Sequence, residues 1–252
     1  MRNALIPELV YKRIVLKLSG ASLKGNSSYG IDPAALTYLA DELAQVSALS
    51  VQIAVVVGGG NFWRGEEWEA RGMDRATADY TGMLATIMNS LALQDAMERK
   101  GLVTRVMSAI DVQAVAEPYI RRRAMSHLTQ DRIVLFAAGS GNPYMTTDTT
   151  AALRSLEIDA EVLLMAKHRV DGVYDSDPNK NPTAKKFQHL DYIEALNLRL
   201  EVMDVTALSL CMDNHLPIIV FDLFTPGTLA RILGGETLGT LVGQKEPLVT
   251  RG

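Results

Sequence analysis

The sequence contains little cysteine and has no excess of basic residues. Cys211 is the only cysteine among 252 residues, which excludes an intrachain disulfide and a cysteine-rich metal cluster. The four histidines do not have the spacing of metal ligands. The formal net charge of −4 argues against an extended nucleic acid partner, which requires a basic surface, but it is compatible with a small nucleotide in a local pocket.

The sequence also lacks a long hydrophobic run. No segment is long and apolar enough to span a bilayer, and the first 11 residues lack the apolar core of a signal peptide. We therefore expect a cytoplasmic protein without a membrane partner. Because no linker or low-complexity segment interrupts the chain, we expect one domain over residues 11–243, with an N-terminal extension at 1–10 and a C-terminal tail at 244–252.

What the chain does contain is a regular alternation of strand and helix patterns. Short apolar runs rich in β-branched residues predict strands at 13–18, 53–57, 102–107, 132–138, 161–166, 217–221 and 239–243. Helical spacing of apolar residues predicts helices at 32–49, from 80 past 91, at 149–156 and within 192–214. This order predicts an α/β fold with a mainly parallel sheet covered by helices on both faces.

The most unusual stretch is Val55–Gly65, where an apolar strand pattern ends in three glycines and Arg64 follows. Adjacent glycines are costly in conformational entropy, but they let backbone N–H groups approach a ligand closely, and phosphate is the commonest such ligand. Arg64 offers a planar, charged fork for the same group. The alternative is a tight turn with an arginine on the surface.

A second glycine-rich loop, Gly139–Asp148, follows another strand and ends in two threonines and a carboxylate before a helix. Hydroxyls and amides at a helix N-terminus also suit an anion. Lys17 ends the first strand, where ligands of open parallel sheets bind. Two such loops predict two phosphate-bearing ligands that face each other, the arrangement needed for phosphoryl transfer.

Two familiar nucleotide motifs are absent from the chain. Gly20–Ser27 nearly matches a P-loop, but Asn26 stands where that motif requires lysine. Gly139–Gly141 lacks the third glycine of the dinucleotide fingerprint, which argues against a Rossmann cofactor.

Some segments allow two interpretations. We expect residues 71–79 to form a loop over the site, with Asp79 either capping the next helix or contacting a ligand. The helix after Tyr80 is apolar on more than one face, which indicates deep burial or an oligomer contact. Arg121–Arg123 is interpreted as the solvated face of a helix rather than a binding patch.

Five motifs of the chain recur together in a known group of enzymes. They are Lys17–Gly20, Val56–Asn61 with Arg64-Gly65, Gly82–Thr86, Gly141–Pro143 with Thr146–Asp148, and Val170–Tyr174. With these motifs the chain resembles the bacterial uridylate kinases of the amino acid kinase family. The resemblance extends from Tyr11 to Val242. It implies a three-layer αβα sandwich around a mainly parallel, twisted sheet, transfer of the γ-phosphate of ATP to UMP, Mg²⁺ bound with ATP, and a homohexamer. GTP as an allosteric activator and UTP as an inhibitor are candidate effectors by the same resemblance.

The resemblance also assigns roles to individual residues. The implied catalytic residues are Lys17 at the transferring phosphate, Arg64 at the phosphate of UMP, and Asp148, which would orient Lys17 and contact the metal shell. The implied ATP site consists of Lys17, Leu18, Ser19, Gly20, Gly60, Arg64, His168, Tyr174 and Asp177. The implied UMP site consists of Gly59, Asp79, Ser140, Gly141, Asn142, Pro143, Tyr144, Met145, Thr146 and Thr147. The segment linked to allosteric activation consists of Gly25, Asn26, Ser27, Ser28, Tyr29 and Gly30.

Three positions depart from the family pattern. Ala21 replaces a glutamate after Ser-Gly, Met145 replaces a common aromatic residue in the uracil pocket, and Lys167–Arg169 replaces an asparagine or threonine near the nucleotide.

Two alternative functions remain open. One is another amino acid kinase that phosphorylates a carboxylate or carbamate, and the Gly141–Pro143 loop favours the nucleotide over that acceptor. The other is a nucleotide-sensing regulator without turnover, which would not need Lys17, Arg64 and Asp148 together.

Overall fold

The computed structural model describes residues 9–167, 170–198, 200 and 202–244. Within these residues one nine-stranded sheet runs through the molecule in the order β4-β3-β5-β2-β1-β6-β8-β9-β7. Its strands are β1 (Arg13–Leu18), β2 (Gln52–Val57), β3 (Thr104–Ser108), β4 (Glu117–Pro118), β5 (Ile133–Ala137), β6 (Val162–Lys167), β7 (His189–Leu190), β8 (Ile218–Asp222) and β9 (Thr240–Val242). All neighbouring strands pair in parallel except β8 and β9, which are antiparallel.

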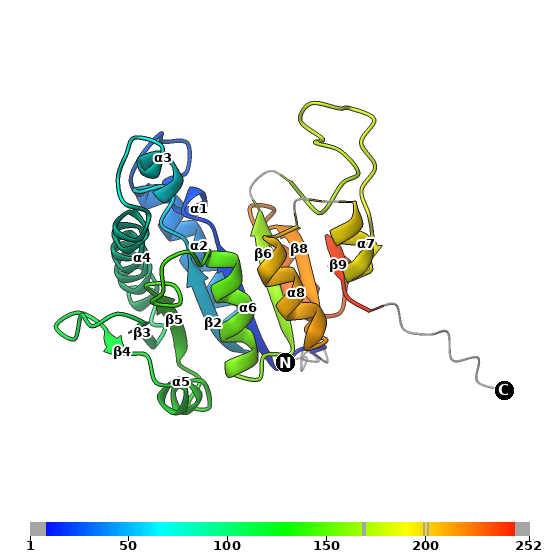
Figure 1. Ribbon diagram of the computed structural model, residues 1–252. Helices are drawn as coiled ribbons and strands as arrows, with labels where there is room; N and C mark the ends of the chain where they lie inside the picture. Colours follow the sequence, from blue (N-terminus) through cyan, green and yellow to red (C-terminus); the bar gives the residue numbers. More distant parts are fainter. Residues whose placement is uncertain (1–8, 168–169, 199, 201, 245–252) are drawn as a thin grey trace, which may run out of the picture.

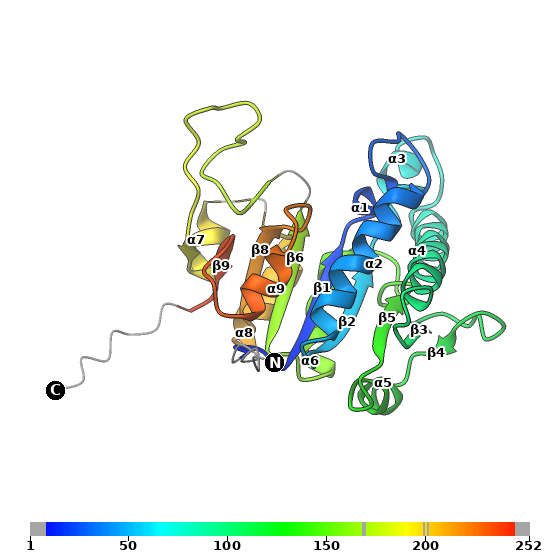
Figure 2. The same ribbon diagram turned by 180° about the vertical axis from the view of Figure 1, so that it is seen from behind.

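Helices cover both faces of this sheet. One face carries α2 (Pro33–Ser47), α4 (Arg75–Glu98) and α9 (Thr228–Leu233), and the other carries α5 (Arg121–Leu128), α6 (Thr147–Glu157), α7 (Tyr192–Asn197) and α8 (Val205–Asp213) (Figures 1 and 2). Two short helices, α1 (Ala21–Lys24) and α3 (Gly65–Glu69), lie at the edge toward which β2 and β6 point (Figure 1). The predicted α/β fold, a three-layer αβα sandwich around a mainly parallel sheet, is confirmed.

Two hydrophobic clusters fill the space between the three layers. Ile14, Leu16 and Leu18 of β1 pack into the cluster under α2, α4 and α9. Val15 packs into the cluster on the opposite face. Because strand side chains alternate between faces, Lys17 shares the face of Val15, which α6 covers. The central strands are therefore buried on both sides, which explains why they are mostly apolar, with Lys17 as the charged exception in β1.

The helix starts follow the capping residues in the sequence. Asp32 caps α2 by accepting a hydrogen bond from the N–H of Ala34, as expected from the following proline. Helix α6 begins at Thr147 with Thr146 as its cap, two residues earlier than predicted. Asp148 therefore lies in the first turn of α6.

The prediction that residues 71–79 form a loop is wrong for their last five residues. Helix α4 begins at Arg75, and Asp74 caps it by accepting from the N–H of Thr77 at 2.9 Å. The capping interpretation of Asp79 is also wrong, because Asp79 lies inside the helix. The sequence analysis did not single out Asp74 as the cap, and only the contacts of the folded chain show it.

Helix α4 carries apolar residues on two faces, of which one is buried and one is exposed. Met83 and Ile87 are buried in the core, whereas Tyr80, Leu84 and Met88 are exposed by 46%, 50% and 52%. These three residues are four apart and form one exposed apolar stripe along the helix. Arg121–Arg123 on α5 are exposed, which agrees with a solvated face. None of the helices in the described residues is long and apolar enough to cross a membrane.

Candidate active site

The loops that follow the central parallel strands meet at one edge of the sheet. The N–H of Gly58, after β2, donates to the carbonyl of Leu18 at 2.8 Å. A Cβ atom on Gly20 would lie 2.6 Å from the nitrogen of Gly60, and one on Gly59 would lie 2.7 Å from the carbonyl oxygen of Gly82 in α4. Gly20 and Gly59 therefore cannot be replaced by a residue with a side chain, because a Cβ atom would collide with the neighbouring backbone.

A salt bridge joins β1 to α6 at this edge. The Nζ atom of Lys17 lies 2.7 Å from Oδ1 of Asp148, and the two side chains are 14% and 20% exposed. Since β1 lies between β2 and β6 in the sheet, the Lys17–Asp148 pair lies between the loop that follows β2 and the loop that follows β6. This placement agrees with the prediction from the family resemblance that Asp148 orients Lys17.

On the β2 side, a cavity of about 350 Å³ opens between α3, α4 and the Gly139–Asp148 loop. Eight predicted site residues line it: Gly59, Gly60, Arg64, Asp79, Ser140, Met145, Thr146 and Thr147. The other four predicted residues of the loop, Gly141, Asn142, Pro143 and Tyr144, are not among the lining residues. Gly141 instead packs on the backbone of Ala109, with a φ of 81°.

Arg64 stands at the mouth of this cavity in a weak ion pair. Its Nε lies 3.6 Å from Oε1 of Glu67, and both side chains are more than half exposed. Such a pair contributes little to stability, so an anionic ligand can replace Glu67 as the partner of Arg64. A Cβ atom on Gly60 would lie 3.9 Å from the guanidinium carbon of Arg64.

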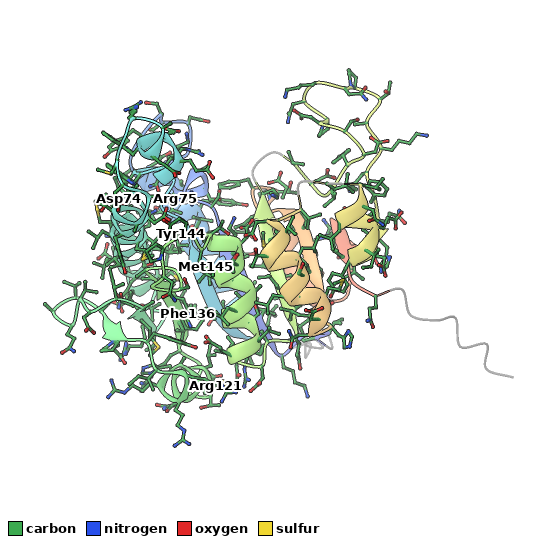
Figure 3. All side chains as sticks on the ribbon, viewed as in Figure 1. Asp74, Arg75, Arg121, Phe136, Tyr144 and Met145 are labelled. Carbon is green, nitrogen blue, oxygen red and sulfur yellow. The ribbon has the colours of Figure 1, made fainter. Side chains whose placement is uncertain are left out.

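Asp79 connects three segments around the cavity. Its Oδ2 accepts from Nε of Arg75 at 2.9 Å and from the N–H of Tyr144 at 2.8 Å. The Arg75 guanidinium also pairs with Glu69 of α3 at 3.1 Å and lies 5.5 Å from the ring centre of Tyr144 (Figure 3). The hydrogen bond to Asp79 raises the pKa of Arg75. Sequence reasoning missed Arg75, because an arginine at the start of a helix carries no distinctive signal.

Two stacked indoles stand beside the same cavity. Trp63 lines the cavity and donates its Nε1–H to the carbonyl of Ala78 at 2.8 Å. Its ring is nearly parallel to that of Trp68 in α3, with centres 4.5 Å apart. The stack holds α3 against the start of α4.

A second cavity, of about 520 Å³, lies beyond β6. Its lining includes Lys167, Tyr174 and Asp177, the last two of which were predicted. The hydroxyl of Tyr174 donates to Asp171 at 2.5 Å, which raises the pKa of Tyr174 to about 12. His168, the remaining predicted residue of this region, lies outside the described residues.

Sequence reasoning also missed Asp204, the cap of α8. Its carboxylate accepts from the hydroxyls of Thr146 and Thr149 and from the N–H of Ala207. It thereby holds the start of α6, which carries Asp148. More than fifty residues separate Asp204 from these threonines, so the sequence gives no signal of the contact.

The predicted regulatory segment packs against the first glycine loop. The N–H of Gly30 donates to the carbonyl of Asn61 at 3.1 Å. The ring of Tyr29 meets that of Phe62 edge-on, with centres 5.5 Å apart.

Comparisons with known proteins identify the family of the chain. The model of the amino acid kinase family matches residues 12–222. The chain is similar to a solved UMP kinase from Bacillus anthracis, at 41% identity over 92% of this chain and 96% of that one, with a TM-score of 0.90. A UMP kinase from Ureaplasma parvum is 39% identical over 92% and 99% of the two chains, with a TM-score of 0.87.

A more distant structure has the same overall shape. The uridylate kinase from Archaeoglobus fulgidus is 27% identical over 91% of this chain and 99% of that one, with a TM-score of 0.69. The match to the family model covers most of the sheet and both glycine loops. The chain therefore belongs to the amino acid kinase family.

Proposed function

We propose that this protein is a UMP kinase, which transfers the γ-phosphoryl group of ATP to UMP and forms ADP and UDP. The observation that carries the proposal is the Lys17–Asp148 ion pair on the strand between the two cavities. Transfer between two nucleotides requires two sites and positive charge where they meet. The identity of 41% and 39% to two UMP kinases supports UMP as the acceptor.

In this proposal UMP occupies the cavity beside α4 and ATP the cavity beyond β6. Gly59 and Arg64 hold the phosphate of UMP, Asp79 its ribose, and Ser140 with Met145–Thr147 the uridine. Tyr174 and Asp177 lie along the adenosine of ATP, as part of the second cavity.

The chemical step is an in-line displacement. An oxygen of the UMP phosphate attacks the γ-phosphorus of ATP, while the bond from this phosphorus to the β–γ bridging oxygen breaks. Negative charge spreads over the transferring oxygens, and Lys17 with the N–H groups of Gly20 and Gly60 stabilises it. No covalent enzyme intermediate is needed, because alignment and preorganised charge supply the catalysis.

The reaction would use Mg²⁺ bound with ATP. Among the described residues, no group of three or more His, Cys, Asp or Glu side chains could hold a metal ion. A single carboxylate near the phosphates is enough for an ion that the phosphates carry, since Mg²⁺ keeps several waters and needs only one or two protein carboxylates. Asp148, next to Lys17, is the carboxylate we assign to that shell. When bound, Mg²⁺ neutralises charge on the phosphates.

We further propose one domain over residues 11–243 and a homo-oligomer, a hexamer by family resemblance, in the cytoplasm. The exposed stripe of Tyr80, Leu84 and Met88 on α4 supports an oligomer contact, because contiguous apolar surface marks interaction sites. GTP activation would act through Gly25–Gly30, which contacts the residue after Gly60, and UTP is the candidate inhibitor.

The test is ADP release with UMP, CMP, AMP and GMP as acceptors, with and without GTP. We expect turnover with UMP well above that with the other three. Turnover with a carboxylate or carbamate instead would favour another amino acid kinase. Nucleotide binding without any turnover would favour a regulator.

A further inference from the structure

A reciprocal pair of buried amides lies directly behind the first glycine loop. Asn89 of α4 and Asn61 are 0% and 3% exposed. The Nδ2 of Asn61 donates to Oδ1 of Asn89 at 2.9 Å, and the Nδ2 of Asn89 donates to Oδ1 of Asn61 at 2.7 Å. The pair thus joins a helix on one face of the sheet to the loop at its edge.

Each amide has a second hydrogen bond, to a loop carbonyl. Asn89 donates to the carbonyl of Gly58 at 2.7 Å, and Asn61 donates to the carbonyl of Gly30 at 2.9 Å. Because both acceptors are carbonyls, they fix which end of each side chain is the NH₂ group. Both donors of each amide are therefore used.

The bond to Gly58 sets the direction of the next N–H group. In a trans peptide the C=O and the following N–H point in opposite directions. Holding the Gly58 carbonyl toward Asn89 therefore aims the Gly59 N–H away from α4. In the described part of the chain, the N–H groups of Gly59 and Gly60 have no protein acceptor, and both residues line the cavity beside α4. A glycine loop cannot hold such an orientation by itself, because glycine has the widest backbone freedom.

Stability alone does not explain a polar pair at this position. Met83, Ile87 and Leu93 of the same helix pack into the apolar core. Replacing both partners of a buried hydrogen bond by apolar groups of the same shape is nearly neutral for stability. An apolar pair could therefore fill the space, but it could not fix the Gly58 carbonyl.

We propose that Asn89 is a positioning residue for phosphoryl transfer, which with Asn61 aims the N–H group of Gly59 at the phosphate of UMP. This inference rests on the proposed kinase function and adds a residue that touches neither nucleotide. Because Asn61 also holds Gly30, the same pair connects the Gly25–Gly30 segment to the loop.

The experiment compares Asn89→Asp and Asn89→Ala with a matched control, Ser90→Ala. Ser90 is the next residue of α4 and is also 0% exposed, but its hydroxyl donates only to the carbonyl of Thr86 in the same helix. Steady-state kcat and the KM for UMP are measured with ATP and Mg²⁺ from about pH 5.5 to about pH 8.5, and thermal melts are recorded for all variants.

We expect kcat to fall at least about tenfold in both Asn89 variants and to stay near the wild-type value in Ser90→Ala, because small displacements of aligned groups are costly in rate. Asn89→Asp places an oxygen against the Gly58 carbonyl when ionised, but its protonated form can donate an O–H there. The loss of kcat in Asn89→Asp should therefore become smaller as the pH falls, whereas the loss of kcat in Asn89→Ala should not depend on pH. A merely structural role would not produce this difference.

Unchanged kcat in folded Asn89 variants, or equal pH dependence in both, would overturn the inference. So would failure of both variants to fold at about 10 °C while Ser90→Ala folds, because the pair would then serve the fold itself. If the wild-type protein and Ser90→Ala did not turn over UMP, the proposed function would fail instead.

Discussion

Removal of the Lys17–Asp148 pair should affect turnover much more than binding of UMP. At 2.7 Å and an effective dielectric constant of 20, the attraction between the two charges is about 6 kcal/mol before desolvation. This exceeds the side-chain entropy of a lysine, about 2 kcal/mol, so Asp148 holds the ammonium group in place. In Asp148→Asn a hydrogen bond from the ammonium group to a neutral amide oxygen, worth about 1.5–3 kcal/mol, replaces the ion pair, and it only about balances that entropy.

The assay is steady-state kinetics on Lys17→Ala, Asp148→Asn and the double variant, with UMP binding measured separately. Loss of one preorganised charge should lower kcat about a hundredfold or more in Lys17→Ala. Asp148→Asn should lose roughly ten- to a hundredfold, and the double variant should resemble Lys17→Ala, since groups that act as a unit are not additive. A Lys17→Ala protein that binds UMP normally and keeps near-full turnover would refute the assignment, and fully additive losses would show that Asp148 does not act through Lys17.

Three further predictions concern α4 and its ends. Asp79→Ala should raise the KM for UMP by about tenfold, because it removes the carboxylate proposed to hold the ribose and releases the N–H of Tyr144 and the side chain of Arg75; an unchanged KM would contradict a ligand role. Asp74→Ala should melt earlier than the wild type at neutral pH. Hydrogen bonds from Thr77 lower the pKa of Asp74 below its ordinary value of 3.8, so the stabilising carboxylate is ionised at pH values above 3.8. The melting temperatures of the variant and the wild type should therefore converge as the pH falls below 3.8. Leu84→Glu places a charge in the exposed apolar stripe of α4 and should lower the assembly mass measured by light scattering. An unaltered mass would show that this stripe is not part of the oligomer contact.

Much of the fold was predictable because strand and helix signals are local. The runs at β2, β5 and β6 lie between helices and are buried on both faces, so each has a continuous apolar stretch, whereas Lys17 interrupts the run of β1. The carboxyl ends of parallel strands share one edge, which brought Lys17 and the two glycine loops together in the prediction.

The parts that were not predictable depend on contacts between distant segments. Asp74 and Asp79 both suit a helix start, and only the folded chain shows that the second accepts from Tyr144, 65 residues away. Asp204 meets Thr149 across 55 residues. Asn89 looks like an ordinary polar residue of an amphipathic helix until its amide is seen against Gly58. Polar side chains carry no periodic signal, so their partners appear only in three dimensions.

The stacked indoles beside the first cavity make the protein its own optical probe. Trp63 and Trp68 are the only two tryptophans in the chain, so fluorescence excited at wavelengths that tyrosine does not absorb arises from this one location. Rings nearly parallel at 4.5 Å also couple their electronic transitions, which should give a paired band in near-ultraviolet circular dichroism. Because Trp63 lines the cavity, a ligand entering it should change both signals. Occupancy of the acceptor cavity can thus be titrated without a label and without turnover.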